Sequence, residues 1–375
     1  MSRIQRISGV RRVPWRWIRR VVLGVVVLAV AYLALAPTGR YLVRAAWEEG
    51  HILAHRRPIS RIIADSRTPP AVAAKLRLVL AARAFAADSI GLQAKQSFTT
   101  YSALEHDTLV LVLSGAYRDR LEPYTWWFPI VGRVPYKGYF DFNAAKDGAK
   151  QLDARGFDVY LRPSPAFSTL GWFNDPLLST SLHADSLELA NTVVHELTHN
   201  TYYAPGSAIF NESFANFVGA RGSAWFFRTR GAAAAADEAD ARWSDEKLLA
   251  RFWALLYHRV DSAFKVHPND SLARLTARDS LYTAARRELV DSLGPQFRTI
   301  SPRALERVRL DNAALLAHRI YDTDLDLFDA LWAREHGDLR RTVLRVIELA
   351  KSRPNDPFGA LRSGVVENTA ARSSP

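Results

Sequence analysis

The motif HELTH at positions 195–199 is the sharpest chemical signal in the sequence. It lies in the stretch ELANTVVHELTHN, which reads as a helix, and on a helix residues four apart share one face. His195 and His199 can therefore present two imidazole nitrogens to one zinc ion at ~2.0–2.1 Å. Glu196 lies one step around the helix, where it can act as general base for a water that zinc acidifies to a pKa of about 7. The alternative is a pair of solvated histidines on a helix face.

A catalytic zinc site of this kind needs a third protein ligand. A metzincin would place a further His six residues after His199 and a Gly three residues after it, but Pro205 and Tyr202 occupy those positions. A turn of Ala, Pro, Gly and Ser leads instead into the helical stretch AIFNESFANFVGA, which offers Glu212. This is the only acidic residue within positions 197–236. Two antiparallel helices joined by a short turn would bring it against the histidines. The alternative is an exposed helix carboxylate.

Four further residues are candidates for supporting roles around the metal. Asn211 and Asn216 could orient ligands through hydrogen bonds. A tetrahedral oxyanion needs a donor besides the metal, and Tyr203, four residues after His199, is one candidate. Tyr321, in a later helical stretch, is the other. For each tyrosine the alternative is an aromatic ring packed in the core.

The segment before the motif could bind the substrate backbone. Peptides often bind as an added strand along the edge of a sheet, and residues 164–171 (SPAFSTLG) could form such an edge. Thr169 and Gly171 are then substrate-binding candidates, and Asp175 could hold a substrate α-amine. The alternative for Asp175 is a structural turn, because Asn174 precedes it and Pro176 follows it.

The elements that would position these residues indicate an α+β fold. Residues 108–114 and 157–162 read as strands, with a helix at 143–155 between them, and the chain reads as helical after Ser186. We therefore expect a small mixed or antiparallel sheet and a predominantly helical C-terminal half. The expected boundaries are 1–20 for a basic segment, 21–36 for a transmembrane anchor or signal, 37–351 for the zinc peptidase domain (sheet about 108–175, metal-site helices about 186–230, then a helical remainder) and 352–375 for a flexible tail.

The N-terminus predicts a membrane attachment. Residues 21–36 carry no charge, and sixteen helical residues span ~24 Å of the ~30 Å hydrocarbon core. Trp15, Trp17 and flanking arginines can complete the span at the interface. Because the first twenty residues are basic, they should stay in the cytoplasm, which places the rest in the periplasm of a bacterium, attached to the inner membrane. A cleaved signal is the main alternative, although Pro37 would hinder cleavage; a buried helix is the other.

Composition excludes several other functions. The chain has 375 residues, no cysteine and a net charge of +12. Seven arginines precede the first apolar run, and subtracting them from +12 leaves +5 for the rest, so we expect no nucleic-acid partner. The absence of cysteine excludes disulfides, a thiol nucleophile and an all-Cys zinc site. Neither the Gly-x-Ser-x-Gly elbow of a serine hydrolase nor a phosphate-binding Gly-x-x-x-x-Gly-Lys loop is present.

Several segments together resemble a family of bacterial predicted zinc aminopeptidases. They are HELTH, the following FNESFANFVG and the preceding PAFSTLGWFNDPLL, with YLVRAAWEEGHILAHRRPI, YTWWFPIVGRVPYKGYFD and LDNAALLAHRIYD farther away. The resemblance covers roughly Tyr41 to Ala350. It implies a zincin-like fold and a gluzincin-like site, with His195, His199 and Glu212 on zinc and Glu196 as base. Family members carry cysteines in the aromatic stretch, and several are lipid-attached at an N-terminal Cys; this chain has neither, so a transmembrane helix would replace the lipid.

The resulting hypothesis is a membrane-anchored zinc peptidase that hydrolyses peptides, with aminopeptidase activity favoured by the resemblance. One alternative is a zinc amidase or peptidase acting on cell-wall peptides. Another is a non-enzymatic envelope protein with a structural zinc site. Structural zinc sites use four closed ligands and need no base. Glu196 and a set of only three evident ligands therefore favour catalysis.

Overall fold

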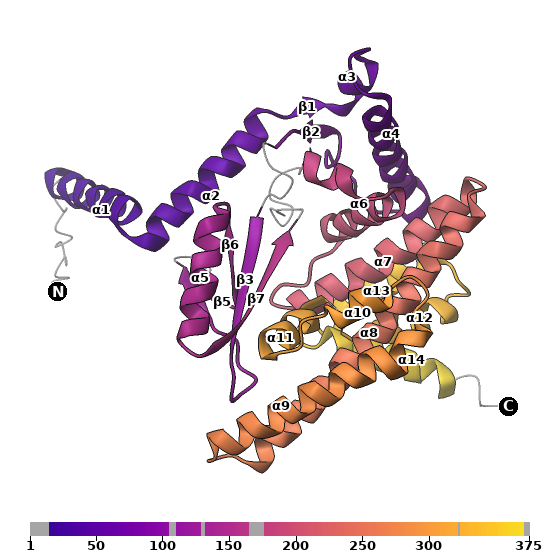
Figure 1. The fold of residues 1–375 in the computed structure, drawn as a ribbon. Coiled ribbons are helices and arrows are strands. Elements are labelled where there is room, and N and C mark those ends of the chain that lie inside the picture. The colour runs from indigo at the N-terminus through magenta and orange to yellow at the C-terminus, as the bar shows by residue number, and fades with distance from the viewer. Residues whose placement is uncertain (1–14, 105–109, 129–131, 165–175, 322, 371–375) are drawn as a thin grey trace, which may run out of the picture. The chain divides into compact units, whose positions relative to one another are not determined.

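The computed structural model describes residues 15–104, 110–128, 132–164, 176–321 and 323–370. The chain divides into two compact units, Met1–Ala54 and His55–Pro375. Figure 1 labels their helices and strands in chain order.

The N-terminal unit consists of two helices, α1 (Trp15–Leu35) and α2 (Pro37–Ala54). Helix α1 begins six residues before the expected apolar run, and its 21 residues have no buried member. At 1.5 Å per residue its length is about 31 Å, which matches the hydrocarbon core. This helix is therefore long and apolar enough to cross a membrane or to serve as a signal sequence.

The central sheet of the second unit has three antiparallel strands in the order β6-β3-β7. These strands are β3 (Val110–Tyr117), β6 (Tyr136–Tyr139) and β7 (Phe157–Ser164). Helix α5 (Phe142–Ala154) covers one face of the sheet (Figure 1). Because side chains alternate along a strand, Leu113 and Phe157 point to that face, where they pack on Leu152 of α5. The predicted strands and the helix between them are confirmed.

Two smaller sheets accompany the central one. One joins β1 (Arg57–Pro58), β2 (Thr100–Ser102) and β8 (Leu177–Leu178), with β2 antiparallel to β1 and parallel to β8. The other pairs β4 (Trp126–Phe128) with β5 (Gly132–Val134). Of these strands, β1, β2 and β8 lie outside the range of about 108–175 in which a small sheet was expected. Strands of two or three residues are too short to show an alternating pattern in the sequence.

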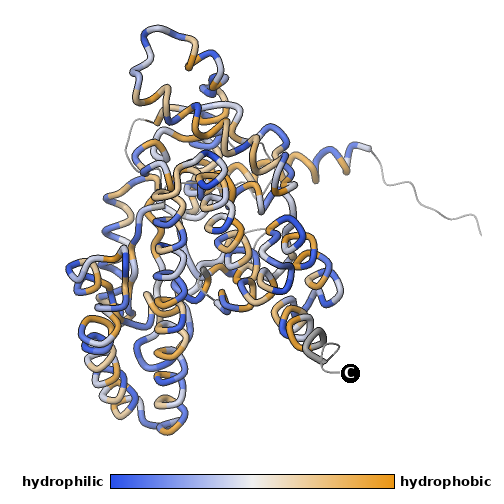
Figure 2. Tube along the Cα trace, turned by 90° about the vertical axis from the view of Figure 1, so that its right-hand side faces the viewer, coloured by the Kyte–Doolittle hydropathy of each residue, from blue (hydrophilic) through white to orange (hydrophobic). Residues whose placement is uncertain are grey.

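Helices make up most of the second unit and confirm the expected α+β class. The candidate metal ligands lie on α6 (Ser186–Thr201) and α7 (Ala208–Thr229). The other helices are α3 (Ile59–Ala64), α4 (Pro70–Phe85), α8 (Ala233–Val266), α9 (Ser271–Arg287), α10 (Pro302–Glu306), α11 (Asn312–Tyr321), α12 (Leu325–Arg334), α13 (Leu339–Ser352) and α14 (Pro357–Ala370), with short helical turns at η1 (Ala86–Ile90), η2 (Ser179–His183), η3 (Glu288–Leu293) and η4 (Gly294–Gln296). Figure 2 shows hydrophobic and hydrophilic residues alternating along these helices, as burial of one face requires.

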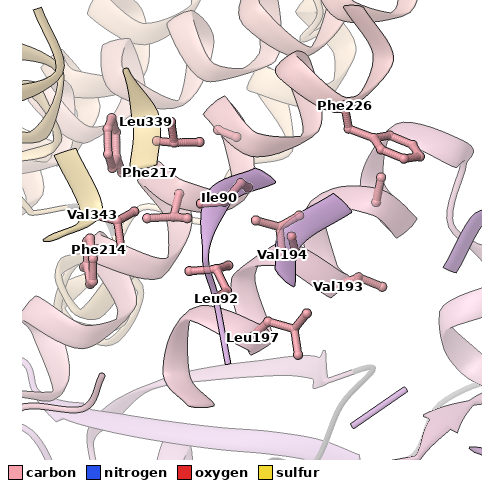
Figure 3. Packing of buried hydrophobic residues seen from close by; sticks show 14 of the residues in the cluster. Ile90, Leu92, Val193, Val194, Leu197, Phe214, Phe217, Phe226, Leu339 and Val343 are labelled. Carbon is pink, nitrogen blue, oxygen red and sulfur yellow. The ribbon is translucent and has the colours of Figure 1, made fainter. Parts of the chain in front are cut away.

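The main hydrophobic core surrounds α6 and α7. Val193, Val194 and Leu197 of α6 and Phe214 and Phe217 of α7 are all buried in one cluster. Residues from η1 and α13 complete this part of the core (Figure 3). The two helices that carry the motif residues are thus held on their inner faces by the largest apolar cluster of the unit.

The C-terminal segment differs from its expectation. It was predicted to be a flexible tail from Ser352, but α14 forms there and packs on α12 and α13. Ala360 and Leu361 are buried, and Phe358 packs against the same core. The Pro, Gly and Ser content of this segment masked a helix whose stability comes from burial of a few apolar side chains rather than from propensity.

Candidate metal centre

Helix α6 carries both histidines of the motif. Its first turn is capped by the side chain of Asp185, which accepts a hydrogen bond from the backbone N–H of Glu188 at 2.9 Å. The Thr198 hydroxyl donates to the carbonyl of Val194 at 2.9 Å and is buried with the apolar face. The helix is therefore fixed at its start and along its inner face, on the side away from the histidine donors.

A short turn reverses the chain and begins α7. Asn211 is buried and closes this turn by two hydrogen bonds with the backbone of Ala204. The Ala204 N–H donates to the Asn211 side chain at 2.8 Å, and the Asn211 Nδ2 donates to the Ala204 carbonyl at 2.9 Å. Gly206 adopts a φ of 74° in the same turn. By holding this turn, Asn211 thus helps to position the next residue, Glu212, relative to the two histidines.

Two glycines allow α6 and α7 to pack closely. A Cβ on Gly219 would lie 2.1 Å from Oδ1 of Asn191, and a Cβ on Gly222 would lie 2.8 Å from Cγ1 of Val194. Glu212 faces the two histidines. Gly219, later on α7, faces Asn191, which lies one turn before His195 on α6. The helices therefore run antiparallel, as the short turn predicted, and the small residues set their separation.

Three donor groups converge between these helices. Nε2 of His195 and Nε2 of His199 are 3.2 Å apart. The Glu212 carboxylate oxygens lie 3.6 Å from the His195 nitrogen and 3.8 Å from the His199 nitrogen. Ligands of a tetrahedral zinc ion at 2.0–2.1 Å are ~3.3–3.4 Å from one another. The donors therefore fit a metal ion of this size, and these three residues could bind one.

Burial and charge act in opposite directions on the two histidines. Burial and the neighbouring His195 charge lower the pKa of His199 to about 4, although Glu212 opposes the shift. Burial alone would also lower the pKa of His195, but the carboxylates of Glu212, Glu196 and Glu246 outweigh it and raise that pKa. Burial thus favours the neutral form of His199, which is the form that binds a metal, whereas the nearby carboxylates favour the protonated form of His195.

Glu212 is held as a carboxylate. Burial alone would raise its pKa, but its contact with His195 and the charges of His199 and Arg162 lower it. Neither Arg162, on β7, nor Glu246, on α8, was among the residues singled out from the sequence. An Arg in a strand and a Glu in a long helix have no local pattern that points to a site in another segment of the chain. Only the fold brings their charges near the metal-site residues.

The other predicted site residues lie on α6, α7 and α11 and in the turn between α6 and α7. Glu196 is half-buried on α6, and its charge reaches His195. Tyr203 is in the turn after α6 and is 37% exposed, so its ring is not a core residue. Asn216 is one turn after Glu212 on α7, and Tyr321 is the last residue of α11, with its side chain outside the described part.

The predicted substrate-binding residues lie outside the described residues. Thr169, Gly171 and Asp175 all belong to this group. Ser164, at the start of the predicted edge, is the last residue of β7 and pairs with Val110. Within the described part of the chain, β7 pairs with β3 on one side, so it is an edge strand there.

A buried polar network joins the sheet to α11. Asp158 on β7 accepts a hydrogen bond from the N–H of Asn312 at 3.0 Å and pairs with Arg278. The Asn312 side chain donates to the carbonyl of Tyr117 at 2.8 Å. The Tyr282 hydroxyl donates to Oδ1 of Asn312 at 2.6 Å. This explains the Asn in the segment LDNAALLAHRIYD: it fixes the start of the helix that ends at Tyr321.

Comparison with known proteins identifies the family. No curated protein and no solved structure matches the chain. A family model described as "Putative aminopeptidase" matches residues 40–359, which is most of the chain and includes every metal-site residue. The resemblance inferred from the sequence segments is thereby confirmed, and the chain belongs to this aminopeptidase family.

Proposed function

We propose that the protein is a membrane-anchored, zinc-dependent aminopeptidase with a zincin-like metal centre. The observation that carries the proposal is the convergence of His195, His199 and Glu212 donors between two helices, with Glu196 beside them. Two imidazoles and one carboxylate are the ligand set of many catalytic zinc sites. Family membership supports a peptide substrate.

Catalysis is favoured over a structural role by the number of ligands. The metal-binding group found among the described residues has three members. A structural zinc site closes its coordination with a fourth protein ligand, whereas a catalytic site leaves one position for water or substrate. Glu196 also has no role in a purely structural site.

Different residues of the chain then have different roles in hydrolysis. Bound zinc would polarise the substrate carbonyl and acidify the attacking water. Glu196 accepts the proton of that water and delivers it to the leaving amine. Tyr203 and Tyr321 are the candidate donors to the oxygen that gains negative charge. Asn211 and Asn216 position Glu212, the former by holding the turn that precedes it.

Substrate binding and location complete the proposal. The strand edge that continues from β7 would align the peptide backbone, with Thr169 and Gly171 in contact and Asp175 at the α-amine. Helix α1 would anchor the protein in the inner membrane, with the basic segment 1–20 in the cytoplasm and the peptidase domain, 37–351, in the periplasm. No nucleic acid takes part.

A peptide library separates the possible activities. The full-length chain in detergent, loaded with zinc, is incubated with mixed peptides beside Glu196→Gln, and products are read by mass spectrometry. Stepwise loss of N-terminal residues with the parent alone supports the proposal. Internal cuts would contradict the aminopeptidase assignment, and no cleavage by folded, zinc-bound protein would point to cell-wall peptides or to a structural metal.

A further inference from the structure

A cavity of about 650 Å³ lies beside the turn that joins α6 to α7. Residues 206–210 form part of its wall, and Trp253 and Tyr257 of α8 and Arg319 of α11 form another part. Its volume falls in the range of about 300–1,000 Å³ that is usual for small-molecule sites. None of the three metal-site donors lines it, so it is a separate compartment.

The cavity is nevertheless close to the metal-site residues along α7. Ala208 lines the cavity, and Glu212 is four residues farther along the same helix. At 1.5 Å per residue, the two positions are about 6 Å apart along the helix axis. An extended peptide advances ~3.3–3.6 Å per residue. One or two residues beyond a bond held at the metal site would therefore reach the edge of the cavity at Ala208.

Arg319 is the notable charge in this wall. Its guanidinium stacks on the ring of Tyr257, 3.8 Å from the ring centroid. Within the described residues no carboxylate pairs with it. The Thr323 hydroxyl donates to the Arg319 carbonyl at 2.7 Å, which anchors the backbone at this point. Stacking on an aromatic ring leaves the in-plane N–H donors of a guanidinium available to a planar acceptor.

The acidic residues of the wall already have partners. Asp324 forms an ion pair with Arg362. Asp356 accepts a hydrogen bond from the backbone N–H of Gly359 at 2.9 Å, in the first turn of α14. Within the described residues, no ion pair joins either carboxylate to Arg319. Arg362 also lines the cavity but is paired with Asp324, so the wall combines Arg319 with the apolar surfaces of Phe210, Phe358 and Trp253.

We propose that this cavity binds the C-terminal carboxylate of a short peptide through Arg319. The inference rests on the proposed peptidase function and adds a substrate class to it. A guanidinium fork matches a carboxylate in a bidentate pair, and the aromatic walls accept the side chain of the terminal residue. Because the cavity is one or two residues from the metal site, dipeptides and tripeptides fit, and longer chains lose the carboxylate contact.

Two substrates that differ only at the C-terminus test this. We would measure kcat/KM of the full-length, zinc-loaded protein in detergent for trialanine and for trialanine amide. We expect the free acid to be preferred by about 10- to 100-fold, the usual size of a charge-assisted interaction. In Arg319→Gln this ratio should fall to near one, and Arg319→Lys, which keeps the charge without the fork, should give an intermediate ratio.

Arg303→Gln provides the matched control, because Arg303 is an exposed arginine on α10 outside the cavity. It should keep the parental ratio. Equal rates on both substrates with the parent, or an unchanged preference in Arg319→Gln, would overturn the carboxylate site while leaving the peptidase function standing. If the parent hydrolyses neither substrate, the proposed function itself fails, and this inference fails with it. Thermal melting of both Arg319 variants checks that they fold.

Discussion

At the scale of single residues, the two histidines of the motif occupy unlike environments. The Glu212 carboxylate lies 3.6 Å from His195 and 3.8 Å from His199. Burial nevertheless lowers the pKa of His199, and the carboxylates nearby raise that of His195. Two positive imidazoles 3.2 Å apart would repel each other, so a charge on His195 lowers the pKa of His199 further.

This difference between the two histidines predicts the pH at which His199 takes up a proton. In the metal-free protein, His199 should take up a proton only near pH 4, against an ordinary value of 6.5. The folded pKa is the lower one, so this group contributes stability above pH 6.5 that is lost as the pH falls toward 4. NMR of the imidazole protons during an acid titration measures it. A midpoint near 6.5 for both histidines would contradict the prediction.

Substitution of the proposed metal ligand Glu212 and of the proposed base Glu196 should affect zinc binding differently. Glu212→Gln replaces an anionic donor by a neutral one and should weaken zinc binding by more than about tenfold. Glu196→Gln should keep zinc near the parental level, because its carboxylate is proposed as a base and not as a ligand. Zinc per chain after dialysis against graded chelator gives both values. Equal affinity in the parent and Glu212→Gln would remove Glu212 from the ligand set.

At the scale of elements, the close approach of α6 and α7 sets the donor positions. In Gly219→Ala, the new Cβ would lie 2.1 Å from Oδ1 and 3.2 Å from the carbonyl oxygen of Asn191. We expect a loss of about 1–3 kcal/mol of stability from overpacking, with weaker zinc binding, because Glu212 would move away from the histidines. Chemical denaturation and chelator competition measure the two effects.

Gly50→Ala is the control for that substitution. Gly50 lies within a helix, α2, and a Cβ there would meet nothing within 4 Å. Helix propensity alone should then make the change neutral or stabilising by up to ~1 kcal/mol. If Gly219→Ala behaved in the same way, close helix packing would not be what places the donors.

Asn312 joins two elements and should matter for the same reason. Asn312→Ala removes the donor to the Tyr117 carbonyl, in a part-buried contact, and the acceptor of the Tyr282 hydroxyl, in a buried one. Leaving those groups without partners should cost about 1–3 kcal/mol. Thermal or chemical unfolding measures the loss. Asn269→Ala, at an exposed position in the turn before α9, should have little effect. Equal stability of the two variants would contradict the structural role.

The elements also show which parts of the fold could be predicted from the sequence. Strands β3 and β7 and helix α5 fall within three residues of their predicted bounds, because the residue types within each segment favour a strand or a helix. The motif and Glu212 could be predicted because helix geometry alone relates residues four apart, and a short turn relates two helices. Arg162, Glu246 and the strands β1, β2 and β8 depend on contacts between distant segments, which no local pattern records.

At the scale of the whole molecule, the N-terminal unit should determine the compartment in which the proposed peptidase domain works. Helix α1 is about 31 Å long, close to the thickness of the hydrocarbon core. Seven arginines precede its apolar part, without an acidic residue. Positive flanks are retained in the cytoplasm, so the second unit should be on the opposite side of the membrane.

The absence of cysteine makes this topology directly testable. Single substitutions Ser8→Cys, before α1, and Lys146→Cys, exposed on α5, each introduce the one thiol of the chain. A maleimide that cannot cross the inner membrane should label Lys146→Cys, but not Ser8→Cys, in cells with a permeabilised outer membrane. Both should label after lysis. The intact mass of the extracted protein distinguishes an anchor, which keeps residues 1–36, from a signal, which loses them. Labelling of Ser8→Cys in unlysed cells would contradict the predicted topology. It would also contradict the proposal that the metal site encounters peptides in the periplasm.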